Sequence, residues 1–255
     1  MKRYAWFAAV ALLLPLGARA DEAPPPPPKD VWTGKGQLGF IASQGNTQAK
    51  AANAMLDTAY IDDAWKHALH LEGLYGENSG IVSAERWQAL WQSNYTFTSN
   101  LFAFGGLRYD HDLFSGFEYQ NSVTAGIGYS IFNTKATQLS VQVGGGYRVL
   151  HPEEIIKDAD GAVTARVLLP RDSGAIATGG VTYSQALTTT TTLSDKLTVE
   201  AGSLNTMVTN ALALAVKMTD KLALGLGYSF EHNSTPPAGS KKLNTTETVN
   251  LVYGF

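Results

Sequence analysis

The sequence predicts an all-β protein, a twelve-stranded antiparallel transmembrane β-barrel, and three observations support this prediction. Apolar residues alternate with small or polar ones along most of the chain, which is the period of a strand with one apolar face. The expected strands are about ten to fourteen residues long, whereas strands in soluble proteins average about five to six. Their connections are tight at one end and mostly longer at the other, as in outer-membrane barrels.

The composition excludes several classes of function. Hydrophobic residues make up 44% of the chain and charged residues only 16%. The 19 basic and 22 acidic residues create no positive field, so we expect no nucleic acid partner. The chain has no cysteine, which excludes disulfides, thiolate metal sites and a cysteine nucleophile.

Residues 1–20 have the pattern of a secretory signal peptide. Lys2 and Arg3 precede an apolar run, and a small residue, Ala18, stands two positions before Ala20, which predicts cleavage after Ala20. A membrane anchor is the alternative, but the run is short for one and polar residues follow at once. Residues 21–30 contain five consecutive prolines, which favour a stiff periplasmic linker over a docking peptide.

The predicted barrel occupies residues 31–255. In the segment 122–131, for example, Val123 and Ile127 share one face, and Ser122 and Gly126 share the other. The twelve predicted strands lie near residues 32–43, 48–60, 65–77, 84–97, 101–110, 117–132, 137–149, 173–187, 190–203, 207–218, 222–233 and 244–255. With an even number of strands and tight turns on the periplasmic side, both termini would be periplasmic and the longest connection, Leu150–Asp172, would lie outside the cell.

A soluble β-sandwich would show the same alternation, so the positions of the aromatic residues decide between the two folds. A sandwich core would hold them in mid-strand, but here they gather near strand ends, as the two water–lipid interfaces require. Those toward the tight turns are Trp32, Tyr60, Trp65, Tyr95, Phe97, Tyr183, Tyr253 and Phe255. Those toward the longer loops are Tyr75, Trp87, Tyr109, Tyr147, Tyr228 and Phe230.

Several segments resemble a family of salt-induced outer-membrane proteins that is catalogued as a domain of unknown function. The similar segments are residues 32–40, 43–47, 104–110, 126–129, 230–234 and 253–255. The resemblance implies an exported outer-membrane β-barrel and no settled molecular activity, and it supplies no catalytic residues. Outer-membrane barrels also commonly end in phenylalanine, which the insertion machinery recognises. Tyr253 and Phe255 fit such an assembly signal, although a glycine common several positions earlier is missing.

The face opposite the apolar one would line the barrel interior, and its acidic and basic residues balance. From them we predict a polar constriction formed by Glu72, Arg86, Arg108, Asp110, Glu118 and Arg148. Hairpin geometry places Asp110 opposite Glu118, and Arg148 near Gln120 and Ser122. A structural charge network that stiffens the wall is an equally good interpretation of the same residues.

We expect no catalytic residues, no metal and no cofactor. A lipid hydrolase would need a serine, a histidine and an orienting polar residue together. His67 and His70 lie on opposite faces of one predicted strand and so cannot bind one metal. Three further histidines at loop ends are most simply solvated, although they could meet Ser115 at the outer mouth: His111, His151 and His232.

The sequence therefore predicts an outer-membrane protein of a Gram-negative cell, a narrow pore or envelope-permeability protein linked to osmotic or salt stress. A non-conducting structural or interaction scaffold is the alternative, and a surface lipid hydrolase is a remote one. The expected partners are outer-membrane lipid and the barrel-assembly machinery, which would bind the C-terminal strand. The sequence names no solute.

Overall fold

The computed structural model describes residues 30–43, 49–159, 163–238 and 240–254. The expected signal peptide, nearly all of the proline-rich linker and Phe255 lie outside these residues. No helix in the described part of the chain is long and apolar enough to cross a membrane. The strands are β1 (Val31–Ser43), β2 (Ala49–Asp62), β3 (Trp65–Asn78), β4 (Ile81–Thr96), β5 (Leu101–Asp112), β6 (Phe117–Asn133), β7 (Thr137–Lys157), β8 (Val163–Leu168), β9 (Asp172–Ala186), β10 (Thr191–Gly202), β11 (Thr206–Lys217), β12 (Leu222–Asn233) and β13 (Leu243–Gly254).

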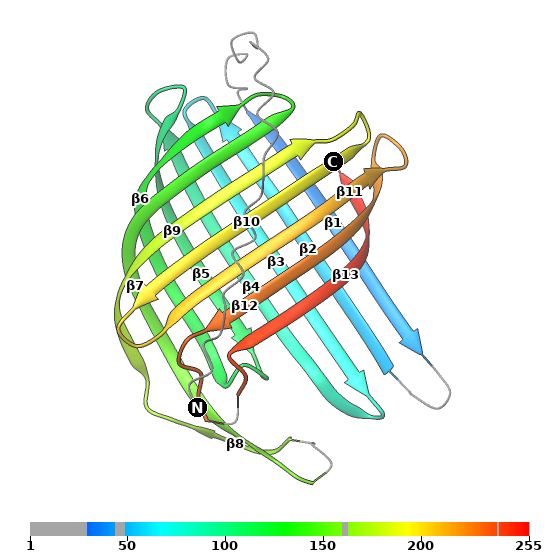
Figure 1. The fold of residues 1–255 in the computed structure, drawn as a ribbon, viewed down its shortest axis with the longest axis vertical. Coiled ribbons are helices and arrows are strands. Elements are labelled where there is room, and N and C mark those ends of the chain that lie inside the picture. Colours follow the sequence, from blue (N-terminus) through cyan, green and yellow to red (C-terminus); the bar gives the residue numbers. More distant parts are fainter. Residues whose placement is uncertain (1–29, 44–48, 160–162, 239, 255) are drawn as a thin grey trace, which may run out of the picture.

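Twelve of these strands form one closed antiparallel barrel, which confirms the predicted fold class. Each strand pairs with its neighbour in the chain, β7 pairs with β9, and β1 pairs with β13 to close the ring. The wall formed by β9–β13 crosses in front of the wall formed by β1–β5 (Figure 1). The connections 63–64, 97–100, 134–136, 187–190 and 218–221 lie at what we call the short-turn end, and the opposite end, which carries β8, is the long-loop end.

The alternation in the sequence becomes an apolar outside and a polar inside. On β6, Val123 and Ile127 are among the exposed hydrophobic residues, whereas Ser122, on the opposite face of the strand, is buried. Aromatic side chains pack on one another near both ends of the outer face. Trp65 lies 4.9 Å from Tyr95 at the short-turn end, and Trp87 lies 4.6 Å from Tyr109 at the long-loop end, measured between ring centroids.

The connection Leu150–Asp172 differs from the predicted irregular loop. Strand β7 continues through it to Lys157 and forms a hairpin with β8, which projects beyond the barrel (Figure 1). The polar and turn-forming residues of this segment suggested a loop, but apolar residues such as Ile155 and Val167 flank them and continue the strands. The strand that does not belong to the barrel is therefore β8, and the barrel itself has twelve strands.

Three inward-facing glycines make a tight corner between β6 and β7. A Cβ atom on Gly126, Gly144 or Gly146 would overlap a backbone oxygen of the neighbouring strand. The rings of Phe102 and Phe104 pack over Gly128 and Gly126 from β5. The glycines thus let this wall bend closely around inward aromatic side chains, which narrows the interior.

The seam that closes the barrel is short. Among the described residues, β1 and β13 share four register pairs, from Lys35 opposite Gly254 to Leu38 opposite Leu251. Each of the other adjacent barrel strands shares at least eleven. Toward the long-loop end the two strands diverge (Figure 1), so the described backbone of Gly39–Ser43 and of Leu243–Asn250 has no partner across the seam.

Candidate functional site

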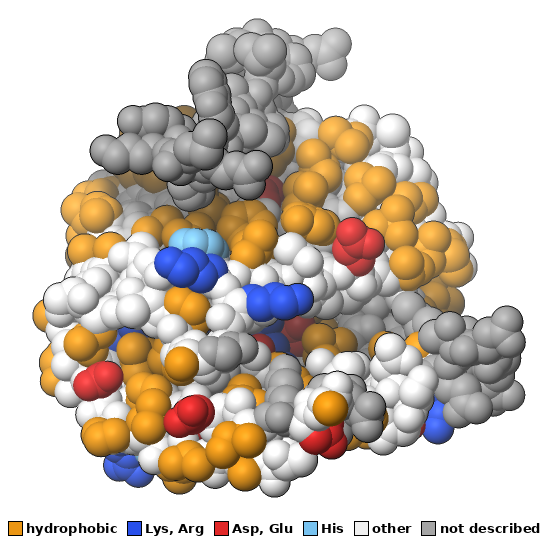
Figure 2. Space-filling model, turned by 60° about the horizontal axis from the view of Figure 1, so that its bottom comes forward, with side chains coloured by type: hydrophobic (Ala, Val, Ile, Leu, Met, Phe, Trp, Pro, Cys, Tyr) orange, Lys and Arg blue, Asp and Glu red, His pale blue; other side chains and the backbone are white. Residues whose placement is uncertain are grey.

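Six charged side chains gather inside the barrel at the long-loop end, and we call them the mouth cluster. Its members are Arg86, Arg108, Asp110, Arg148, Glu200 and Glu231, three cations and three anions. They come from β4, β5, β7, β10 and β12, which puts strands from opposite walls in contact. Figure 2 turns this end toward the viewer, and positive and negative side chains lie interspersed across it without a patch of one sign.

The first half of the mouth cluster links β4 and β5 to β12. Arg108 Nη2 lies 2.8 Å from Asp110 Oδ2 and 3.6 Å from Glu231 Oε2. Arg86 Nη2 lies 3.6 Å from the same Glu231 oxygen, and Arg86 Nε lies 3.4 Å from Asp110 Oδ1. Asp110 is 2% exposed and Glu231 5%, so these charges depend on each other rather than on water for their stabilisation.

The second half surrounds Arg148. Its Nη1 lies 3.5 Å from Glu200 Oε2, and its Nη2 donates to the backbone oxygen of Asn205. Ser122 donates to Glu200 over 3.0 Å. All four residues are buried, so β6, β7, β10 and the turn after β10 are tied together in the interior.

Two asparagines join the two halves. Asn233 Nδ2 donates to Glu231 Oε1 over 2.9 Å, and Asn205 Nδ2 donates to Asn233 Oδ1 over 2.5 Å. Since Asn205 also accepts from Arg148, hydrogen bonds and ion pairs run without a break from Asp110 to Glu200. Nothing in the sequence pattern indicated these asparagines, because they lie at a turn and at a strand end.

Two loops meet above the cluster. A Cβ atom on Gly116, in the β5–β6 loop, would meet Ser240 and Pro237 of the β12–β13 loop. Loops from two distant strand pairs therefore touch over the barrel end. Glu153 reinforces this cover, because its buried carboxylate lies 2.5 Å from Arg166 Nη1 and its backbone N–H donates to the oxygen of Gly116.

The other half of the interior, which we call the lower lumen, holds charges that remain partly exposed. Lys35 Nζ lies 3.4 Å from Asp57 Oδ2, and these side chains are 51% and 32% exposed. His70 lies between two carboxylates, 2.6 Å from Asp57 and 3.5 Å from Glu72. Lys196 is exposed from the other wall. This part of the lumen thus has room for water.

The structure brings four of the predicted constriction residues into the mouth cluster. Arg86, Arg108, Asp110 and Arg148 meet there, and Arg148 stands opposite Ser122 as the hairpin geometry indicated. Glu72 is inward-facing as well, but its ion-pair partner is His70 in the lower lumen.

The predicted position of Glu118 opposite Asp110 is wrong. Asp110 is opposite Gln120, and Glu118 pairs instead with His151. Two irregularities account for this: β5 and β6 shift register between Asp110 and Asp112, and a bulge between Phe117 and Tyr119 shifts the register of β6 against β7. A bulge places one extra residue in one strand and re-aims its side chain, so the simple alternation that put Glu118 beside Asp110 does not hold there.

The histidines of the described chain do not converge on one site. No group of three His, Cys, Asp or Glu residues in the described part could hold a metal ion. His67 accepts or donates a 2.8 Å hydrogen bond with Ser93 and stacks near Trp65 on the outer face. The hydroxyl of Ser115 donates to the backbone oxygen of Asp112 within its own loop.

Of the two residues predicted as the assembly signal, the structure describes Tyr253 at the end of the C-terminal strand. Tyr253 stands opposite Gly36 of β1 and is exposed on the outer face, with Lys221 Nζ 5.9 Å from its ring centroid. Phe255, the other predicted residue of this signal, lies outside the described residues.

Comparison with known proteins gives a family and several distant similarities. A family model described as "Protein of unknown function, DUF481" matches residues 36–255. "Uncharacterized protein YdiY" of Escherichia coli (strain K12) is 24% identical over 251 residues, which covers 94% of this chain and 91% of the relative.

Solved structures with a similar chain path include outer-membrane proteins. The "COG4313 outer membrane channel from Pseudomonas putida F1" has 11% identity and a TM-score of 0.49, with 89% of this chain and 96% of that chain covered. The NanC porin has 13% identity and a TM-score of 0.47, with 88% and 98% covered. These similarities are too distant to transfer an activity or a solute.

Proposed function

Since the chain belongs to the DUF481 family of proteins of unknown function, we propose a function from its own geometry: a narrow outer-membrane pore whose outer mouth is closed in this conformation. The observation that carries the proposal is the contrast between the two faces of the closed barrel. The outside is apolar with aromatic residues toward both ends, which suits lipid. The inside is polar, and its lower lumen is partly exposed.

The mouth cluster is the proposed gate of this pore. Several of its charge pairs are separated by 3.4–3.6 Å. Arg86 Nε, Asp110 Oδ1, Arg148 Nη1 and Glu200 Oε2 make no hydrogen bond with the described residues. Buried groups that lack hydrogen bonds are costly, so this packing is a less stable arrangement than a fully bonded plug and is suited to rearrange.

Location and orientation are tested first, with single cysteines in this cysteine-free chain. Thr164→Cys, in the projecting β8, should react with a membrane-impermeant maleimide on intact cells. The matched Thr189→Cys, in the tight turn between β9 and β10, should react only after the outer membrane is permeabilised. The reverse pattern would contradict the proposed orientation, and recovery of the protein in the soluble periplasmic fraction would contradict the membrane location.

Conductance of the purified protein in planar bilayers tests the pore itself, and Arg148→Ala tests the gate. This variant removes one cation from a balanced cluster and releases Asn205, so we expect more frequent opening and a shift of the reversal potential toward cation preference. The shift should be larger at low salt, where screening is weaker. Lys50→Ala is the control, because it removes an equal charge from an exposed rim pair with Glu77.

A non-conducting scaffold is the second candidate, and the packed mouth cluster is the observation that favours it. If wild type and Arg148→Ala both fold correctly but neither conducts ions in bilayers, the result would support the scaffold over the pore. We further propose assembly through β13, with Tyr253 and Phe255 as its signal. The link to osmotic or salt stress has the family resemblance as its only support, and growth of a deletion strain at high and low salt tests it.

A further inference from the structure

We propose that the β1–β13 seam is a lateral binding site for an uncharged amphipathic molecule with one hydrocarbon chain, taken from the outer leaflet. The inference rests on the proposed outer-membrane location, but not on ion conduction. Three neighbouring features carry it: the short seam, an apolar hollow on the outer face beside it, and a group of amide side chains behind it.

The seam leaves the edges of two strands without a partner. Leu38 and Leu251 form its last register pair, and beyond them the strands diverge toward the long-loop end. Leu38 and Phe40 are 70% and 72% exposed on the outer face. Unpaired backbone groups are costly in hydrocarbon, so a polar group that could bond these strand edges would be favoured at this place.

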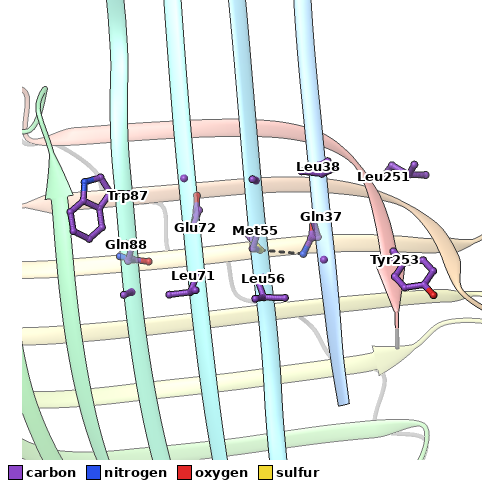
Figure 3. A pocket seen from close by; sticks show the side chains of 14 residues that line it. Gln37, Leu38, Met55, Leu56, Leu71, Glu72, Trp87, Gln88, Leu251 and Tyr253 are labelled. Carbon is purple, nitrogen blue, oxygen red and sulfur yellow. Dashed lines mark hydrogen bonds between the residues drawn. The ribbon is translucent and has the colours of Figure 1, made fainter. Parts of the chain in front are cut away.

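The hollow lies on the outer face directly beside the seam and has a volume of about 640 Å³. That volume falls in the range of about 300–1,000 Å³ typical of small-molecule sites. Small residues on β1–β4 form its floor, and larger apolar side chains including Trp87, Leu38 and Tyr253 surround it (Figure 3). Gln37, Glu72 and Gln88 also border the hollow, but nearly all of the surface exposed in it is apolar, which suits a hydrocarbon chain.

The floor of the hollow has room for a ligand because two of its outward-facing residues are glycines, which have no side chain. A Cβ atom on Gly36 or Gly73 would meet no atom within 4 Å. In register, Ala54 and Gly73 separate Leu38 of β1 from Trp87 of β4. A chain lying across these strands would fill the space between the two large side chains.

An amide group sits behind the last paired residues of the seam. Asn53 Nδ2 donates to Asn250 Oδ1 over 3.0 Å, and Asn250 Nδ2 lies 3.3 Å from Gln37 Oε1. A Cβ atom on Gly39 would overlap both asparagine side chains, so Gly39 lies against them. Amides donate and accept without net charge, which favours a hydroxyl or amide head group over an ionised one.

The closed mouth explains why such a molecule would approach from the side. The mouth cluster and the contact between Gly116 and the β12–β13 loop obstruct the axial route. The seam, in contrast, diverges toward the same end and faces the membrane. The lateral approach therefore offers unpaired strand edges to a molecule that already resides in the outer leaflet.

The test uses a spin-labelled monoacylglycerol as the probe, with the full-length mature protein in nanodiscs. Electron paramagnetic resonance measures the immobilised fraction as the probe is titrated. Gly73→Leu fills the hollow and should weaken binding about tenfold, since a leucine displaces about two methylenes worth about 0.8 kcal/mol each. Gly105→Leu is the matched control, because Gly105 also faces open space but lies away from the hollow.

A second pair of variants tests the seam. The double variant Phe40→Cys with Val249→Cys would join the diverging strands by a disulfide, which we call the seam staple. It should abolish immobilisation of the probe until a reductant opens the disulfide. The control staple, Leu214→Cys with Leu226→Cys, joins residues that are already paired between β11 and β12 and should have no effect. Equal binding by wild type, Gly73→Leu and the seam staple would overturn the proposal. Loss of ion conductance with intact probe binding would count against the pore alone.

Discussion

The two halves of the lumen contain the same kinds of side chain in different surroundings. In the mouth cluster three carboxylates and Arg148 are buried, Arg86 and Arg108 are mostly buried, and the group crosses the barrel. In the lower lumen Lys35, Asp57 and His70 pair at similar distances but keep contact with solvent. The difference shows that pairing alone does not close a barrel interior. Closure requires that the charges from opposite walls replace water for each other.

The largest effect should come from removing one anion of the mouth cluster. Asp110→Ala leaves Arg86 and Arg108 with an uncompensated buried charge, which costs about 3–5 kcal/mol in comparable cases. Asp57→Ala in the lower lumen removes a partly exposed partner, and such pairs contribute about 0–1 kcal/mol. Urea unfolding of the detergent-folded barrels measures both. Equal losses for the two variants would remove the distinction between the two halves.

A smaller effect should follow from adding a methyl group at the β6–β7 corner. Gly144→Ala forces a Cβ atom against the backbone of Ala125, and overpacking of this kind costs about 1–3 kcal/mol. Gly36→Ala, in open space on the other wall, should change stability by about 0.5 kcal/mol or less. The same unfolding assay compares them, and a neutral Gly144→Ala would mean that the corner does not need its glycine.

The smallest effect should come from Glu118, which lies at the edge of the mouth. Glu118→Gln weakens an ion pair with His151 in which the glutamate side chain is 36% exposed, so we expect a loss of about 1 kcal/mol or less. Glu153→Gln is the buried counterpart, with Arg166 as partner and a side chain 2% exposed. Its loss of stability should be clearly greater, and the reverse order would contradict burial as the deciding factor.

How much could be predicted from the sequence depended on how far apart the residues are in the chain. The strands and the pairing of Arg148 with Ser122 follow from alternation within one hairpin, so they were predictable. Glu118 was misplaced because the register shifts at Asp110–Asp112 and at Phe117–Tyr119 have no signature in the alternation. The contact between Arg86 and Glu231 depends on how closely two distant walls approach, which local patterns do not specify. Whether the cluster acts as a constriction stays a prediction.

The four-pair seam also has a consequence for the order of folding. It joins the first and last barrel strands, so it is the pairing with the largest loss of chain entropy on formation, since that loss grows with the length of chain enclosed. Long-range strand pairing is intrinsically slow, and here few hydrogen bonds are gained when it forms. Ring closure should therefore be the last step of assembly and the first to reverse, with the amide protons of β1 and β13 exchanging fastest among the barrel strands.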